Sequence, residues 1–139
     1  HKETGTLEEY RKKVAEGLGF MQYAPIVFVS AKTGQRVERL YELIKYVNDQ
    51  AAQRLTTGML NDIVNEAVAM VQPPSDKGKR LKIYYMTQTG TKPPTFVVFV
   101  NNEELMHYSY LRYLENQLRK NFGFEGTPIK FIVREKGGE

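Results

Sequence analysis

The fold of this 139-residue chain is decided by two stretches, Leu81-Lys82-Ile83-Tyr84-Tyr85-Met86-Thr87-Gln88 and Phe96-Val97-Val98-Phe99-Val100. Both are rich in β-branched and aromatic residues, a composition typical of strands. The second is an unbroken apolar run, which indicates a strand buried on both faces. A link with Gly90 and Pro93-Pro94 joins them. Because this link is short, we expect the two strands to pair antiparallel.

Helix patterns flank this pair on both sides. Apolar residues at helical spacing predict one helix over about 58–71, which Pro73-Pro74 ends, and a second over about 108–122, which Gly123 ends. Residues 73–80 look like a polar loop and 103–106 like a short helical turn. A last strand is expected over 129–133, and the helix before it should bring it back parallel to a strand. The charged residues 134–139 are expected to be a disordered tail.

The N-terminal part predicts a helix, a strand and a second helix. Thr6, with Glu9 three residues later, is a candidate cap for a helix over about 7–18. The apolar run at 25–29 predicts a buried strand, and an apolar stripe over 35–52 predicts a second helix. Residues 55–58 look like a junction, in which Thr57 or Gly58 caps the next helix. One strand cannot form a sheet, so we expect this part to be an incomplete domain.

Composition excludes several kinds of site. The chain has no Cys and only two His, which excludes a disulfide framework and a thiolate or histidine-rich metal site. No apolar run is long enough to span a bilayer, and no signal-peptide pattern opens the sequence. We therefore expect a cytoplasmic, monomeric protein that does not contact a membrane. The net charge of +4 is compatible with a phosphate-rich partner.

The turn after the first predicted strand carries a motif. Ser30-Ala31-Lys32 is similar to the last guanine-recognition motif of Ras-like GTPases, and it lies where open α/β sheets bind ligands. Essentially the whole chain resembles the C-terminal tail of the bacterial double-domain GTPase family Der, also called EngA. The resemblance is carried by Leu60-Asn61-Asp62, Arg80-Leu81-Lys82-Ile83-Tyr84-Tyr85, the stretch from Lys92 to Asn101, the stretch from Glu104 to Tyr110, and the stretch from Phe122 to Ile129.

The resemblance implies two parts. Residues 1–54 would be the C-terminal remnant of a P-loop GTPase domain, an α-β-α unit, with Ser30, Ala31 and Lys32 on the guanine base. Residues 55–139 would be an α+β KH-like domain of type II topology (helix, strand, strand, helix, strand) with a three-stranded mixed sheet. The parent protein would bind GTP or GDP with Mg²⁺, hydrolyse GTP, and act in assembly of the large ribosomal subunit. Its partners would be that subunit's rRNA and proteins, and its own upstream GTPase domains.

The chain itself lacks the catalytic motifs of a GTPase. It has no glycine-rich phosphate loop ending in Lys-Ser or Lys-Thr, no Asp-x-x-Gly switch and no Asn-Lys-x-Asp. We therefore expect no catalytic residue, no bound metal, no tightly held nucleotide and no GTPase activity in this chain alone.

Two surfaces are candidates for contact with RNA. KH domains clamp a nucleic-acid backbone with a Gly-x-x-Gly loop, but the equivalent link here, Met106-His107-Tyr108-Ser109, has no glycine. The densest basic run is Lys77, Lys79, Arg80 and Lys82, which is either an rRNA phosphate contact or a solvated loop. The tyrosines near 84–85 and 108–113 either stack on bases or pack internally. An alternative for the whole chain is a free-standing KH-like module that binds RNA or protein without enzymatic activity.

Overall fold

Three strands form a mixed sheet in the order β3 (Ile83–Gly90), β4 (Thr95–Val100) and β5 (Lys130–Glu135). The computed structural model describes residues 4–28, 34 and 36–136. As expected from the short link and the helical crossover, β3 pairs antiparallel with β4, and β5 pairs parallel with β4. Helix α3 (Thr57–Met70) precedes this sheet, and η2 (Glu103–Leu105) and α4 (Tyr108–Phe122) lie between β4 and β5. The mixed α/β fold with a three-stranded sheet is thus confirmed.

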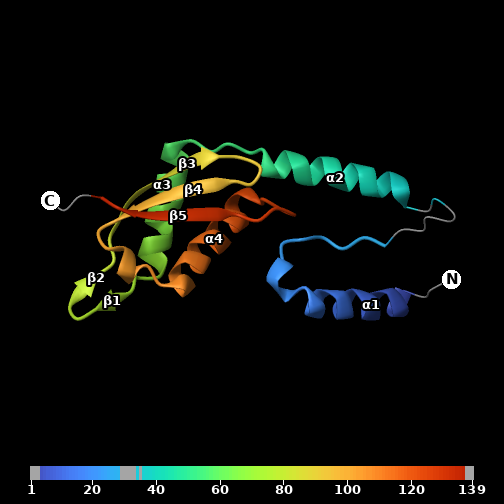
Figure 1. Cartoon of the computed structure of the whole chain (residues 1–139), viewed down its shortest axis with the longest axis horizontal. Coiled ribbons are helices and arrows are strands. Elements are labelled where there is room, and N and C mark those ends of the chain that lie inside the picture. Colours follow the sequence, from blue (N-terminus) through green and yellow to red (C-terminus); the bar gives the residue numbers. More distant parts are fainter. Residues whose placement is uncertain (1–3, 29–33, 35, 137–139) are drawn as a thin grey trace.

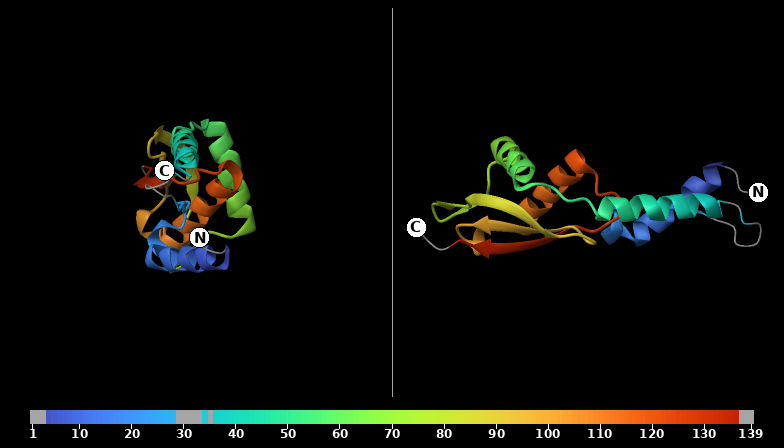
Figure 2. Two further views of the ribbon diagram at one scale, coloured as in Figure 1. Left: turned by 90° about the vertical axis from the view of Figure 1, so that its right-hand side faces the viewer. Right: turned by 90° about the horizontal axis from the view of Figure 1, so that it is seen from above.

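Helices α3 and α4 cover one face of the sheet, and no helix of the described residues covers the other (Figure 2). The core between the two layers is apolar: Leu60, Val64, Ala67, Met86, Phe96, Val98, Val100, Leu114, Leu118 and Phe124 are all buried. At its edge, Tyr110 donates its hydroxyl to the Val71 carbonyl at 2.8 Å. Burial, and secondarily the neighbouring Tyr113, raises the pKa of Tyr110 to about 12.

The C-terminal part of the chain corrects three local predictions. Residues 73–80 contain a small hairpin, β1 (Ser75–Asp76) with β2 (Lys79–Arg80), because Lys77 and Gly78 both take the positive φ of a hairpin turn. Thr56, rather than Thr57 or Gly58, caps α3, since its hydroxyl accepts the Met59 N–H at 3.1 Å. Strand β5 includes Arg134 and Glu135, which were expected in the tail, because the ladder with β4 continues to Val100.

The N-terminal part consists of α1 (Thr4–Gly17), η1 (Gly19–Met21) and α2 (Val37–Ala51) (Figure 1). Thr6 lies inside α1 and does not cap it, since the helix begins one turn earlier than predicted. The predicted strand over 25–29 is wrong for residues 25–28, which belong to no helix or strand. Within the described residues they have no neighbouring strand to pair with; instead the Arg11 guanidinium donates to the Ile26 carbonyl at 2.7 Å.

Helix α2 is left largely uncovered. It contains no buried residue, and the apolar Tyr41 and Ile44 are 69% and 56% exposed. Its C-terminal end is nevertheless attached to the sheet domain, because the Lys92 N–H donates to the Ala51 carbonyl at 2.9 Å. The apolar stripe of α2 is therefore a helix face that the rest of the described chain leaves largely uncovered.

One buried side chain fixes the link between α2 and α3. The Gln88 amide oxygen accepts the Leu55 N–H at 2.7 Å. Its amide nitrogen donates to the carbonyls of Gln53 at 2.9 Å and Gly90 at 3.0 Å. Gln88 therefore uses both ends of its amide to hold the linker against β3.

Candidate nucleic-acid interface

The guanine-loop residues Ser30, Ala31 and Lys32 lie outside the described residues, so their assignment stays a prediction. The chain leaves the loop through Gly34 and Arg36, whose φ values of 72° and 67° are left-handed. Helix α2 begins at the next residue, Val37, so the loop leads through a sharp turn into a helix N-terminus.

The structure brings Lys77, Lys79, Arg80 and Lys82 together on and beside the β1–β2 hairpin. All four side chains are exposed. The two ion pairs found among the described residues, on α1 and α4, involve none of them. Arg80 donates to the Pro73 carbonyl at 2.7 Å, and the Lys82 ammonium lies 5.4 Å from the centre of the Tyr84 ring. The hairpin thus projects cations without a compensating carboxylate contact, which suits phosphate oxygens.

The turn equivalent to the KH clamp has a different character. It leads from η2 into α4, and His107 occupies the N-cap position without a side-chain capping bond. Tyr108 follows and is 75% exposed. With side chains at all four positions and no glycine, this turn gives a phosphate no close approach to the backbone.

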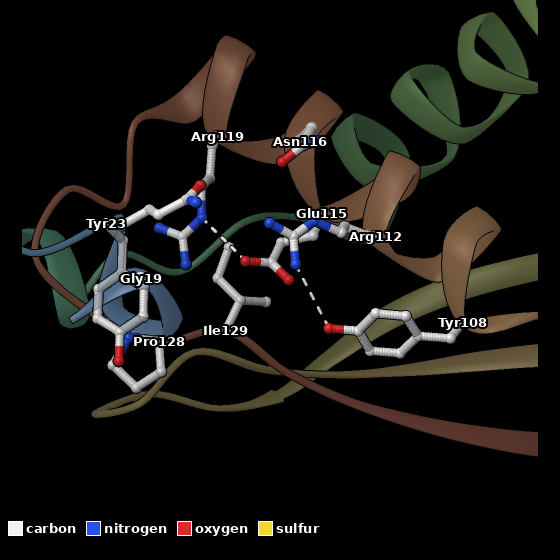
Figure 3. A pocket seen from close by; sticks show the side chains of 10 residues that line it. Gly19, Tyr23, Tyr108, Arg112, Glu115, Asn116, Arg119, Pro128 and Ile129 are labelled. Atoms are coloured by element: carbon white, nitrogen blue, oxygen red, sulfur yellow. Dashed lines mark hydrogen bonds and ion pairs between the residues drawn. The ribbon is translucent and has the colours of Figure 1, made fainter. Parts of the chain in front are cut away.

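A cavity of about 570 Å³, which no sequence pattern indicated, lies between α4, the segment before β5, and η1 (Figure 3). Its lining includes Tyr108, Arg112, Glu115, Asn116 and Arg119 from α4. These residues recur at three- or four-residue spacing, so one helix face presents them all. That spacing was visible in the sequence, but nothing in it indicated that η1 would close the other side.

Arg119 lines this cavity and has several partners within the chain. It forms an ion pair with Glu115 at 3.1 Å and donates to the carbonyls of Phe124 at 2.8 Å and Thr127 at 3.0 Å. Its guanidinium also lies 5.1 Å from the ring centre of Tyr23, which comes from the N-terminal part. Three of its five N–H donors are thus engaged within the chain, which gives Arg119 a structural role.

Arg112 also lines the cavity and has fewer partners than Arg119. It is exposed, and it donates a long hydrogen bond of 3.4 Å to the Tyr108 hydroxyl (Figure 3). A guanidinium beside an exposed phenol can hold an anionic group and a flat ring. The neighbouring Glu115 opposes an anion less than a lone carboxylate would, because Arg119 neutralises it.

Two other kinds of site are not found. Across residues 4–28, 34 and 36–136, no three His, Cys, Asp or Glu side chains are grouped as metal ligands would be. Over the same residues, no helix is long and apolar enough to cross a membrane.

Comparison with known proteins identifies the family of the sheet domain. The family of KH-domain-like modules of EngA bacterial GTPase enzymes, C-terminal, matches residues 54–134. The chain belongs to this family. It is 78% identical over 138 residues to GTPase Der of Ruminiclostridium cellulolyticum and 75% identical over 138 residues to GTPase Der of Acetivibrio thermocellus. Both alignments cover 99% of this chain, which spans 31% of the length of each relative.

Proposed function

We propose that this chain forms the C-terminal part of a GTP-hydrolysing factor that acts on the large ribosomal subunit. The observation that carries the proposal is the 78% identity to a protein named GTPase Der over nearly the whole chain. In the complete protein, upstream domains would bind GTP or GDP with Mg²⁺ and hydrolyse GTP. This chain supplies no phosphate loop, so its own contribution is recognition and docking.

Residues 1–54 would complete a P-loop GTPase domain, with Ser30, Ala31 and Lys32 against the guanine base. The exposed apolar residues of α2 support this assignment, because Tyr41 and Ile44 are the kind of surface that a neighbouring sheet covers. The unpaired segment 25–28 supports it as well, since an added strand would satisfy its backbone groups.

A binding measurement tests the first part. The chain alone should not bind GTP in the micromolar range, because most nucleotide affinity comes from phosphate and Mg²⁺ contacts. Isothermal titration calorimetry with GTP and Mg²⁺ should show no saturable heat. Micromolar binding by the chain alone would contradict the assignment of residues 1–54.

Residues 55–139 would form the KH-like docking domain, with the β1–β2 hairpin on rRNA phosphates. The exposed cations support this assignment, because they outnumber the one carboxylate of the hairpin, Asp76, and form no ion pair among the described residues. The turn at 106–109 has no glycine and no lysine or arginine. The hairpin is therefore the better candidate for contact with the backbone of RNA.

Charge reversal tests the hairpin. Lys79→Glu with Arg80→Glu should weaken binding of the complete protein to the large ribosomal subunit. The slope of log affinity against log salt should fall by roughly two, about 0.9 per lost phosphate contact. The matched reversal Lys12→Glu with Lys13→Glu on α1, and His107→Ala, should leave binding nearly unchanged. If His107→Ala abolishes binding and the hairpin reversal is silent, the contact runs through the 106–109 turn instead.

A further inference from the structure

The sheet face opposite α3 and α4, here called the open face, carries aromatic rings. On β4, Phe96 and Val98 point into the core, so Val97 and Phe99 point to the open face. Tyr85 lies opposite Phe99 in the ladder, and the two rings stack with their centres 4.5 Å apart and their planes at 24°. Both rings are half-buried, so their outer surfaces remain in contact with solvent.

A β-bulge adds a third ring to this surface. The register between β3 and β4 shifts between Ile83 and Tyr85, which leaves Tyr84 as the extra residue. Strict alternation would place Tyr84 and Tyr85 on opposite faces, yet the Lys136 ammonium lies 5.7 Å from one ring centre and 5.5 Å from the other. The bulge therefore turns two successive tyrosines toward one cation. Tyr84 is 39% exposed.

Cations surround these rings. Lys82 lies 5.4 Å from the centre of the Tyr84 ring, and Arg134 stands beside Phe99 in the parallel ladder. Lys82, Arg134 and Lys136 are exposed, and none forms an ion pair within the described part of the chain. Glu135 lies between Arg134 and Lys136 in the sequence, but its side chain is on the other face of the sheet, where it accepts the Glu103 N–H at 2.9 Å.

The arrangement of cations and aromatic rings favours one class of binding partner for the open face. Protein interfaces are depleted of lysine at their centres, whereas here cations lie directly over the aromatic rings. Single-stranded nucleic acid is recognised by the opposite pattern, in which bases stack on aromatic side chains and cations track the backbone. The basic hairpin leads directly into the open face, because Arg80 and Lys82 precede β3 on the chain.

We propose that the open face binds a single-stranded segment of RNA, with unpaired bases stacked on Tyr84 and on the Tyr85–Phe99 pair. Lys82, Arg134 and Lys136 would hold its phosphates. This inference rests on the proposed function, since it takes the RNA held by the hairpin and adds a site for its unpaired bases. It places base contact on the sheet, away from the α4 cavity.

The test uses the full chain and a fluorescently labelled single-stranded RNA of about ten nucleotides, within the usual site sizes of such surfaces. Tyr84→Leu should weaken binding by at least about fivefold, the lower end of the loss of one stacked base. The salt slope should not change, because no phosphate contact is removed. Tyr84→Phe should bind RNA as tightly as the unmutated chain does, since the aromatic ring is kept. Tyr41→Leu, on α2, is a matched exposed control and should be silent.

The outcomes separate this inference from the proposed function. Suppose that Tyr84→Leu binds RNA as tightly as the unmutated chain, while Lys79→Glu with Arg80→Glu weakens binding. Stacking on the open face is then wrong, and the hairpin contact stands. If a duplex of the same sequence competes as well as the single strand, unpaired bases are not recognised and the inference fails. If the parent chain binds no RNA, the RNA part of both proposals fails.

Two further results would move the site elsewhere. Loss of RNA binding in Tyr108→Leu, with Tyr84→Leu silent, would place base contact in the α4 cavity. Loss of association with the upstream GTPase domains in Tyr84→Leu, with RNA affinity intact, would make the open face a protein-docking surface. Either result overturns the proposal.

Discussion

Replacing Gln88 with leucine should destabilise the sheet domain through one defined set of contacts. Gln88 is 9% exposed, and its amide oxygen satisfies the N–H of Leu55, itself 7% exposed. A buried donor left without a partner costs about 1–3 kcal/mol, and the carbonyls of Gln53 and Gly90 each lose a bond worth about 1 kcal/mol. Leucine regains about 1 kcal/mol by apolar burial. We therefore expect the free energy of unfolding to fall by about 2–4 kcal/mol.

Urea denaturation followed by far-UV circular dichroism measures this loss. With an m value of about 2 kcal/mol per molar, the unfolding midpoint should fall by about 1–2 M while m stays constant. Gln72→Leu, at an exposed position, is the matched control and should change stability by no more than about 0.5 kcal/mol. If Gln88→Leu changes stability no more than this control does, the Gln88 contacts do not hold the linker.

A second variant tests the direction of the hydrogen bonds. Gln88→Glu keeps an oxygen for the Leu55 N–H but sets a second oxygen against the carbonyls of Gln53 and Gly90. Ionisation is therefore disfavoured in the folded state, and the pKa of this glutamate should lie above its ordinary value of about 4.3. Stability should then fall as pH rises above that value, because the unfolded chain releases the proton first. A variant whose stability instead rose with pH would refute the assigned orientation of the amide.

Three further predictions concern the packing of the sheet domain. Gly126→Ala should destabilise the chain and loosen α2, because φ at Gly126 is +83° and an added Cβ would lie 2.5 Å from Val47 Cγ2. Amide hydrogen exchange at the C-terminal end of α2 should become faster. Leu60→Ala should lower the free energy of unfolding by about 2–5 kcal/mol in urea titration, since the side chain is fully buried. Stability should fall between about pH 10 and 12, because Tyr110 keeps its proton in the folded state after the unfolded chain has lost it; Tyr110→Phe should flatten this part of the profile.

The elements whose patterns are local could be predicted from the sequence alone. Helix α4 has the predicted bounds of 108–122, because an apolar stripe and Gly123 mark its face and its end. Strand β4 lies within one residue of its apolar run, and the order of elements with one short link and one helical crossover leaves few topologies. The family was also visible in the sequence, since short runs such as Phe122 to Ile129 are specific in order as well as in composition.

Features that depend on contacts between distant segments could not be predicted in this way and are seen only in the folded chain. Residues 25–28 have the composition of a strand, but a strand needs a neighbour to pair with, and the described chain offers none. Gln88 reads as a surface residue of a strand, yet it becomes buried by satisfying a linker more than thirty residues away. Likewise, no periodic pattern in the sequence indicates the bulge at Tyr84 or the closure of the α4 cavity by η1. Periodicity reports which side of an element is apolar, whereas these features depend on which segment meets that side.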